Sequence, residues 1–181
     1  MSLLTVIKYP APSLKKPSVE VREFNSWLQD IVKNMFETMY AEHGIGLAAP
    51  QVGENIRLFV MDIQKPDPFQ EGQVIHNKIC MVNPRLTKAE GLINYEEGCL
   101  SCPDLIVEVE RAKDIVVESL TPDGKAQRHV LTELEAVCAQ HEMDHLKGIL
   151  LVDKISRLKR EMYGKERVRA RRDDSDKPIL A

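Results

Sequence analysis

The sequence predicts an α+β fold in which antiparallel strands pack around a central helix, with a further helix at the C-terminal end. Apolar and polar residues alternate in 105–111 and in 114–120, a pattern typical of half-buried strands. Apolar residues at helical spacing predict a helix at 23–43. The central helix is predicted to hold His141-Glu142-Met143-Asp144-His145, which has the pattern H-E-x-x-H.

The size and composition of the chain are those of an ordinary soluble globular protein. It has 181 residues and a mass of 20.6 kDa, so we expect a single domain over 1–181. Its content of 43% hydrophobic and 29% charged residues argues against a disordered or membrane-spanning chain. A chain of this length can bury a complete core without disulfides.

The cysteines and the absence of long apolar runs indicate a cytoplasmic protein. The four cysteines, Cys80, Cys99, Cys102 and Cys138, do not form the pattern of a disulfide framework. Residues 1–8 are too short an apolar run for a signal peptide, and no stretch approaches the length of a membrane span. We therefore expect free thiols in a reducing compartment, no membrane attachment, and cysteines that can bind metal.

Charge is unevenly distributed along the chain. The net charge is -3, but 154–172 holds nine Lys or Arg and two acidic residues, which gives this segment +7 and the remainder -10. The basic segment 154–181, predicted as a helix and tail, is therefore expected to meet an anionic partner. Nothing in the sequence predicts DNA binding.

The first fifty residues combine an irregular entry, a helix and a loop of small residues. Three prolines in 5–21 predict an extended, irregular segment. Gly44 is expected to end the helix at 23–43. In the loop at 44–53, Gln51 is the only polar side chain, so the loop is either a tight turn or a substrate-lining segment with one amide donor.

The middle of the chain is predicted to be rich in strands. Strands are expected at 56–63, 79–82, weakly at 86–95, and at 127–131, with a loop at 64–77. The strand at 79–82 is expected to stop at Pro84. Thr121-Pro122-Asp123-Gly124 predicts a turn, because it has Pro at the second position and Gly at the fourth.

The ends of the last two helices also have local signals. Thr132 with Glu135 three residues later predicts a capping box at the start of the central helix, and Gly148 is expected to end it. A solvated C-terminal helix is expected at 156–172, followed by a frayed end at 172–181.

The H-E-x-x-H pattern has the geometry that a metallohydrolase needs. On a helix, His141 and His145 lie four residues apart on one face, where both imidazoles can reach one metal ion. Glu142 lies beside the first histidine, where its carboxylate can act as a general base without being a ligand. Since the pattern also occurs by chance in charged helices, a third ligand has to be found.

Cys99 is the strongest candidate for that third ligand. It lies between a glycine and a predicted chain reversal, and its thiolate would complete a Cys-His-His set with one open position. Cys138 is one turn before His141 and is more suited to a pocket wall, while Cys80 lies in a strand. Including Cys102 would instead give a closed Cys2His2 site of the structural kind.

Three motifs together resemble the signature motifs of the peptide deformylases. They are Gly44-Ile45-Gly46-Leu47-Ala48-Ala49-Pro50-Gln51-Val52-Gly53, Glu97-Gly98-Cys99-Leu100-Ser101 and Gln140-His141-Glu142-Met143-Asp144-His145, in the order found in that family. The resemblance covers about residues 3–160, which would be the catalytic core.

The resemblance implies a role for each matching residue. Cys99, His141 and His145 would bind the metal, and Glu142 would be the general acid and base. Gln51 and the backbone N–H of Leu100 would stabilise the oxyanion. The backbone of Ile45 and Gly46, together with Glu97, would bind substrate.

The resemblance also implies the metal, the substrate and the reaction. Ligand chemistry alone favours Zn²⁺, whereas the family uses Fe²⁺, for which Zn²⁺, Ni²⁺ or Co²⁺ can substitute. The substrate would be the N-formylmethionine of nascent polypeptides. Water activated by the metal would attack the formyl carbon while Glu142 takes and returns the proton, and formate would leave.

The pocket is expected to be apolar, with two departures from the family pattern. Leu134, Val137 and Cys138 precede His141 on its face of the helix and are predicted to surround the methionine side chain. Many members of the family carry an arginine near the position of Ile106, which is apolar here. Tyr95 replaces a smaller aliphatic residue and would narrow the rim of the pocket.

Two other functions remain open on sequence grounds. A peptidase could use the same H-E-x-x-H chemistry on unformylated peptides. A structural metal module could use Cys102 as a fourth ligand, with its basic tail on RNA. For a deformylase, the basic C-terminal helix at 154–181 could bind the ribosome, or it could be only a solvated charged helix.

Overall fold

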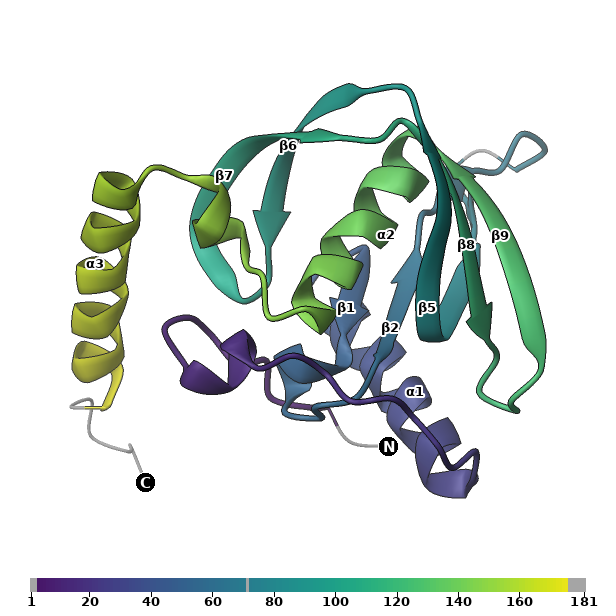
Figure 1. The fold of residues 1–181 in the computed structure, drawn as a ribbon, viewed down its shortest axis with the longest axis horizontal. Coiled ribbons are helices and arrows are strands. Elements are labelled where there is room, and N and C mark those ends of the chain that lie inside the picture. The colour runs from purple at the N-terminus through teal and green to yellow at the C-terminus, as the bar shows by residue number, and fades with distance from the viewer. Residues whose placement is uncertain (1–2, 71, 176–181) are drawn as a thin grey trace.

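A five-stranded antiparallel sheet with a helix on each face forms the centre of the structure (Figure 1). This computed structural model describes residues 3–70 and 72–175, with side chains through residue 170. The strands, in spatial order, are β1 Gly46–Ala48, β2 Leu58–Asp62, β5 Lys78–Glu90, β8 Asp114–Leu120 and β9 Ala126–Thr132.

Two smaller sheets and the helices complete the described part of the chain. β6 Ile93–Cys99 pairs with β7 Cys102–Arg111, and β3 Lys65–Pro66 pairs with β4 Val74–Ile75. The α-helices are α1 Ser26–Ala41, α2 Glu133–Leu146 and α3 Arg157–Ser175, and short 3₁₀ helices lie at Pro12–Lys15, Ala49–Val52 and Leu151–Lys154. The predicted α+β fold with a central helix and a C-terminal helix is confirmed.

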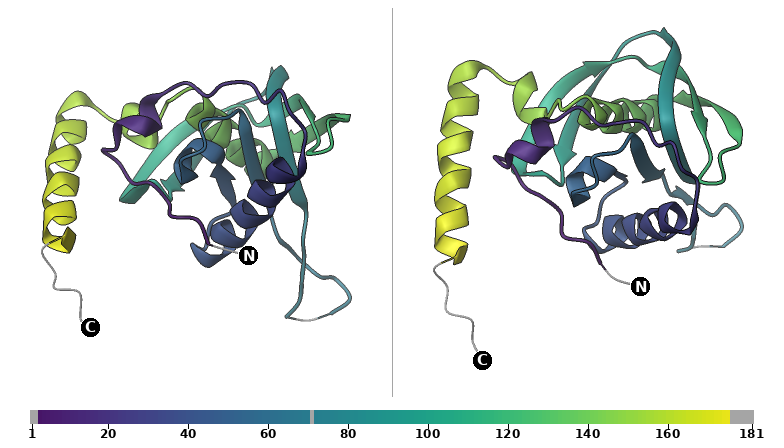
Figure 2. Two further views of the ribbon diagram at one scale, coloured as in Figure 1. Left: turned by 90° about the horizontal axis from the view of Figure 1, so that it is seen from below. Right: turned by 60° about the horizontal axis from the view of Figure 1, so that its bottom comes forward.

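Strand β2 explains how the two main cores are divided. All five of its residues are buried, and they alternate between the two faces of the sheet. Phe59 and Met61 pack into the core beneath α2, whereas Leu58 and Val60 pack into the core beneath α1. A strand covered on both faces has no polar side, which is why 56–63 is almost continuously apolar. Figure 2 shows α1 and α2 on opposite sides of these strands.

Helix α2 begins without the predicted capping box. Thr132 is the N-cap residue, but its side chain makes no capping hydrogen bond. Thr132 is also the last residue of β9, paired with Asp114, and the Glu133 N–H donates to the Lys113 carbonyl at 2.8 Å. The strand ladder therefore determines the backbone at this end. Glu133 has φ +49°, an uncommon conformation for a residue with a side chain.

The other end of α2 agrees with the prediction. The helix stops at Leu146, and Gly148 has φ +72°. The Gly148 N–H donates to the His145 carbonyl at 3.0 Å, and the Ile149 N–H donates to the Asp144 backbone carbonyl at 3.0 Å. These bonds satisfy carbonyls that a helix end leaves without partners.

Gly148→Ala is expected to lower the free energy of unfolding by about 1–3 kcal/mol. The left-handed backbone disfavours a side chain, and the added Cβ would overlap the Lys15 carbonyl. The measurement is thermal or urea unfolding followed by circular dichroism. Gly53→Ala is the control: φ is +93° there, but the nearest atom, Ile7 Cδ1, lies 3.7 Å from the added Cβ. Equal losses in the two variants would contradict the role given to the Lys15 contact.

Helix α1 is shorter than the predicted 23–43, since it begins at Ser26 and ends at Ala41, and the left-handed residue after it is one position earlier than expected. His43, not Gly44, adopts the left-handed conformation, with φ +57°. Gly44 is required for another reason, since a Cβ there would lie 2.9 Å from Leu100 Cδ1. The glycine therefore allows close approach to the turn after β6.

The strand predicted to stop at Pro84 continues. β5 runs from Lys78 to Glu90, with register shifts against β8 between Val82 and Arg85 and again further along. Pro84 lies in the first irregularity, where its missing N–H costs no ladder bond. The expected division into strands 79–82 and 86–95 is wrong for this reason. Residues 93–99 instead form β6.

Most of the remaining expectations for the second half of the chain agree with the structure, but residues 172–175, which were expected to be frayed, belong to helix α3. β8 has the predicted limits, and the Gly124 N–H donates to the Thr121 carbonyl at 2.9 Å, closing the predicted turn. The expected C-terminal helix is α3, which continues to Ser175; the rest of the tail, 176–181, lies outside the described residues. Among the described residues, no helix is both long and apolar enough to cross a membrane.

Candidate metal centre

Three side chains from two elements bring metal-binding atoms together. His141 and His145 come from α2, and Cys99 comes from the end of β6. His145 Nε2 lies 3.2 Å from His141 Nε2 and 3.3 Å from Cys99 Sγ, and the three binding atoms all lie within 4.8 Å of one another. Bonds of about 2.0–2.1 Å to nitrogen and about 2.3 Å to sulfur give tetrahedral edges of about 3.3–3.6 Å. The donor set therefore fits one tetrahedral divalent ion.

A buried ion network orients His141. Its Nδ1 lies 2.8 Å from Glu97 Oε2, and Arg111 binds both oxygens of Glu97 at 2.7 and 2.9 Å. Arg111 also donates to Asp144 at 2.7 Å. Burial acts to raise the pKa of Glu97, but Arg111 and His141 outweigh it and hold this pKa at about 2. The ionised Glu97 fixes the proton on His141 Nδ1, which leaves Nε2 free for the metal.

His145 is placed as a neutral ligand. Its side chain is almost completely buried, and burial holds its pKa well below the ordinary value. Its Nδ1 has no hydrogen-bond partner within the described part of the chain. A neutral imidazole is the form that coordinates a metal.

Glu142 lies beside the donor set without belonging to it. Its carboxyl group is buried, and burial raises its pKa to about 7. One oxygen, Oε2, has no protein partner among the residues described. The other packs so closely against β1 that a Cβ on Gly46 would overlap it. A carboxyl group in this setting can change its protonation state near neutral pH, as a general acid and base must.

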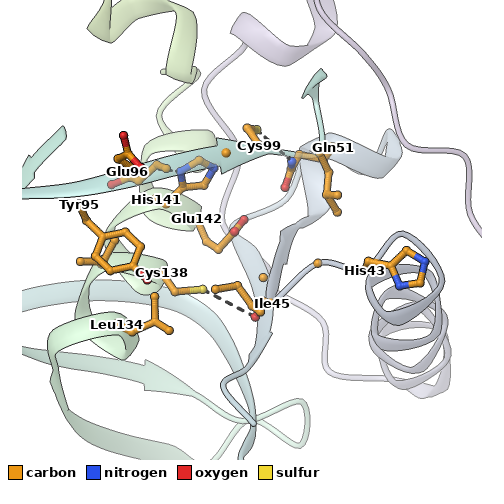
Figure 3. A pocket seen from close by; sticks show the side chains of 16 residues that line it. His43, Ile45, Gln51, Tyr95, Glu96, Cys99, Leu134, Cys138, His141 and Glu142 are labelled. Carbon is orange, nitrogen blue, oxygen red and sulfur yellow. Dashed lines mark hydrogen bonds and ion pairs between the residues drawn. The ribbon is translucent and has the colours of Figure 1, made fainter. Parts of the chain in front are cut away.

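Gln51 is held with its amide nitrogen towards the same point. Its Oε1 accepts the Ala48 N–H at 2.8 Å, and its Nε2 donates to Ser101 Oγ at 3.1 Å. The same Nε2 lies 3.8 Å from Cys99 Sγ (Figure 3). Leu100 follows Cys99 in the turn, and its carbonyl accepts from Lys8 Nζ at 2.9 Å. The amide is therefore fixed before any ligand binds.

These groups meet at a cavity of about 390 Å³ (Figure 3). Eleven of the twelve predicted site residues line it: Ile45, Gly46, Gln51, Glu97, Cys99, Leu100, Leu134, Val137, Cys138, His141 and Glu142. His145, the twelfth, does not line the cavity and is 2% exposed. Tyr95 lines the cavity, while Ile106 is 64% exposed. Cys102 is not part of the donor set.

Some residues of the site were not predicted. His43, Glu96 and Gly98 also line the cavity, and Arg111 connects Glu97 to Asp144. The sequence did contain a signal for Arg111. Val107, Val109 and Arg111 occupy alternate positions of β7, and all three are buried. A charge at a core position predicts a buried partner.

Comparison with known proteins identifies the family. The sequence model of the family described as Polypeptide deformylase matches residues 3–161. The chain belongs to this family. A peptide deformylase of Thermodesulfovibrio yellowstonii is 45% identical over 92% of this chain and 97% of its own length. A peptide deformylase of Zymomonas mobilis is 44% identical over 97% of this chain and 99% of its own length.

Solved structures of peptide deformylases have the same fold. The crystal structure of the Legionella pneumophila enzyme superposes with a TM-score of 0.83 at 36% identity, over 98% of this chain and 100% of the other. The structure of the Ehrlichia chaffeensis enzyme in complex with actinonin superposes with a TM-score of 0.83 at 32% identity, over 92% of this chain and 96% of the other. The resemblance in the three sequence motifs is thus confirmed, and the chain is an enzyme of the peptide deformylase family, which is metal-dependent.

Proposed function

We propose that the chain hydrolyses the N-formyl group of formylmethionine at the start of nascent polypeptides and releases formate. The convergence of Cys99, His141 and His145 beside Glu142, at the base of a partly apolar cavity, carries this proposal. We propose Fe²⁺ as the ion, with Zn²⁺, Ni²⁺ or Co²⁺ able to replace it. A divalent cation on these residues would supply Lewis acidity.

The side chains around the donor set have separate roles in this proposal. Glu142 takes a proton from the attacking water and returns it to the amine that leaves. The Gln51 amide and the Leu100 N–H donate to the formyl oxygen as negative charge develops on it. The Glu97 carboxylate accepts from Arg111 through both oxygens and contacts His141, so we propose that its main role is to position His141.

The free edge of β1 offers a place for the peptide backbone. β1 is the edge strand of the five-stranded sheet, and Ile45 and Gly46 line the cavity. An extended peptide can add to such an edge through backbone hydrogen bonds. We propose that the residues after methionine bind here, with Tyr95 at the rim.

The test is formate release from formyl-Met-Ala-Ser by protein loaded anaerobically with Fe²⁺. Unformylated Met-Ala-Ser is the matched substrate. Formate release without cleavage of the unformylated peptide supports deformylation. Cleavage of Met-Ala-Ser favours the peptidase, and neither reaction despite one bound metal per chain favours the structural metal module.

Leu134→Glu is expected to raise KM for a formyl-Met peptide about tenfold to a hundredfold, because the contact surface for an apolar side chain is lost. Leu134 lies in the wall of the cavity on α2, as do Val137 and Cys138. Val130→Glu is the control, since Val130 is 62% exposed on neighbouring β9 and lies outside the cavity. Steady-state kinetics measure the effect. An unchanged KM in Leu134→Glu would place the methionine side chain elsewhere.

We propose that α3 binds anionic ribosomal RNA, which would place the enzyme in the cytoplasm beside its substrate. In Figure 1, α3 stands apart from the central sheet, and Lys159, Lys165 and Arg169 are exposed. The Tyr163 ring stacks on the Tyr9 ring, with 5.8 Å between the ring centroids, and this contact anchors α3 to the N-terminal segment. This anchoring leaves the charged side of α3 open to a partner.

Reversing the three exposed charges, Lys159→Glu, Lys165→Glu and Arg169→Glu together, is expected to abolish co-sedimentation with ribosomes at low salt while formate release from a short peptide persists. The substitutions spare Tyr163, so the helix keeps its anchor. Co-sedimentation equal to that of the unmodified chain would leave α3 as a solvated helix only.

A further inference from the structure

Cys99 and Cys102 face each other across a tight turn. They are opposite residues in the antiparallel pairing of β6 and β7, and only Leu100 and Ser101 lie between them. Directly opposite residues of an antiparallel pair project to the same side, with Cα atoms about 4.5–5.5 Å apart. A disulfide needs a Cα separation of about 4.4–6.8 Å. Both thiols are free in this structure, and the pairing of their backbones corresponds to the range that a disulfide spans.

The turn between the two cysteines is held from outside. Lys8 Nζ donates to the Leu100 carbonyl at 2.9 Å, and the Tyr9 N–H donates to the Ser101 carbonyl at 2.8 Å. The backbone of 99–102 is therefore fixed by the N-terminal segment. In this fixed turn, the bond between the two sulfur atoms would form by rotation of the side chains.

The two thiols differ in access to solvent. Cys99 is partly exposed and lines the cavity, so a small molecule can reach its sulfur. Cys102 is 1% exposed and lies in the core formed with Leu14, Val152 and Tyr163. It does not belong to the group that can hold the metal. An oxidant in the cavity therefore meets Cys99 first, and Cys102 is reached only through Cys99.

We propose that Cys99 and Cys102 form a redox modification site, in which a hydroperoxide oxidises Cys99 and Cys102 resolves the product as a disulfide. The Cys99 sulfur attacks the O–O bond, which gives a sulfenic acid and releases water or an alcohol. The Cys102 sulfur then attacks the oxidised sulfur and displaces its oxygen as a second water. Two thiols lose two electrons and two protons, and the peroxide takes up both.

The disulfide would remove one of the three metal donors. Two histidines alone are a poorer site, so the metal is released. Without Cys102, the sulfenic acid would proceed to the sulfinic and sulfonic acids, which dithiols do not reduce. Cys102 thereby makes the oxidation of a metal ligand reversible.

The experiment treats the zinc-loaded full chain with hydrogen peroxide, because Zn²⁺ itself takes no part in redox chemistry. Peptide mass spectrometry without reductant locates the oxidised sulfur atoms, and a chromogenic chelator measures released zinc. The chain with native cysteines is expected to form the Cys99–Cys102 link and to lose one zinc per molecule. Dithiothreitol followed by zinc restores both the free thiols and the bound metal.

Cys102→Ala and Cys102→Ser are expected to accumulate sulfinic or sulfonic acid on Cys99 and to bind no zinc after dithiothreitol. Cys80→Ala is the matched control, since Cys80 is in β5 and outside the cavity, and it should behave like the native chain. If both Cys102 variants fail to fold, the inference is tested by peroxide treatment of the metal-free native chain, in which the Cys99–Cys102 disulfide must also form.

Two results would overturn the inference. One is overoxidation of Cys99 in the native chain to the same extent as in the Cys102 variants. The other is a link from Cys99 to Cys138, or no link at all in the metal-free chain. Because mass and zinc content are the measured quantities, these outcomes are separate from failure of deformylation.

Discussion

Glu142→Gln is expected to lower kcat for formate release about a hundredfold to ten-thousandfold while the protein still binds one metal per chain. The amide has the size of the carboxyl group but cannot take up a proton from water. Glu142 Oε2 has no partner in the described structure, so the amide loses no hydrogen bond there. The melting temperature should therefore change little.

Kinetics, metal analysis and thermal unfolding on one preparation measure this effect. Glu108→Gln is a suitable control, because Glu108 is exposed on β7 and does not line the cavity. It should retain the kcat of the unmodified chain. If Glu142→Gln kept its activity, another group would have to move the proton, and if it lost its metal, Glu142 would be a ligand.

Arg111→Met is expected to cause the largest loss of stability, about 3–5 kcal/mol. Arg111 is 7% exposed and is the cation that binds both oxygens of buried Glu97. Without it, the Glu97 charge is buried with only His141 as partner. Asp144 is less affected, since Lys154 Nζ lies 3.1 Å from it.

Two comparison variants make this measurement specific. Arg85→Met removes an exposed Arg85–Glu118 pair at 2.6 Å and should cost less than about 1 kcal/mol. The double variant Glu97→Gln with Arg111→Met should be more stable than Arg111→Met alone, because no charge is left unpaired. Urea unfolding gives the three values. A double variant no better than Arg111→Met would mean that the loss comes from packing.

The pH dependence of stability should change in the same variant. The pKa of Glu97 is lowered in the folded chain from 4.5 to about 2. Its ionised form therefore stabilises the fold above pH 4.5, and this contribution is lost as the pH falls towards 2. In Arg111→Met the loss over this range should be smaller.

Local patterns predicted most of the elements because the relevant signals are short in range, but they missed the pair of β3 with β4, which lies in the expected loop 64–77. The spacing of His141 and His145, the glycine after α2 and the alternation of β8 each depend on a few neighbouring residues. Cys99 is identified as the candidate third ligand by its place between a glycine and a chain reversal, and the family motifs agree with that choice. Its distance from α2 could not be predicted locally, because it is determined by the pairing of β6 with β7.

The wrong predictions concern residues whose conformation depends on distant parts of the chain. Thr132 does not cap α2 because β9 already determines its backbone. Gly44 is a glycine because of Leu100, and not because of the end of α1. Pro84 does not end β5, since the partner strand accommodates an irregularity there. In each case a tertiary contact overrides a local preference.

The shortness of β1 has a consequence for the range of proteins that the enzyme could process. The strand has three residues, Gly46–Ala48, so its edge spans about 10 Å at about 3.3 Å per residue. A peptide pairing with it would be read over two or three residues, through backbone atoms that every sequence shares. Such an enzyme would be selective for the first residue and tolerant of nearly everything that follows, as a catalyst serving all newly made chains must be.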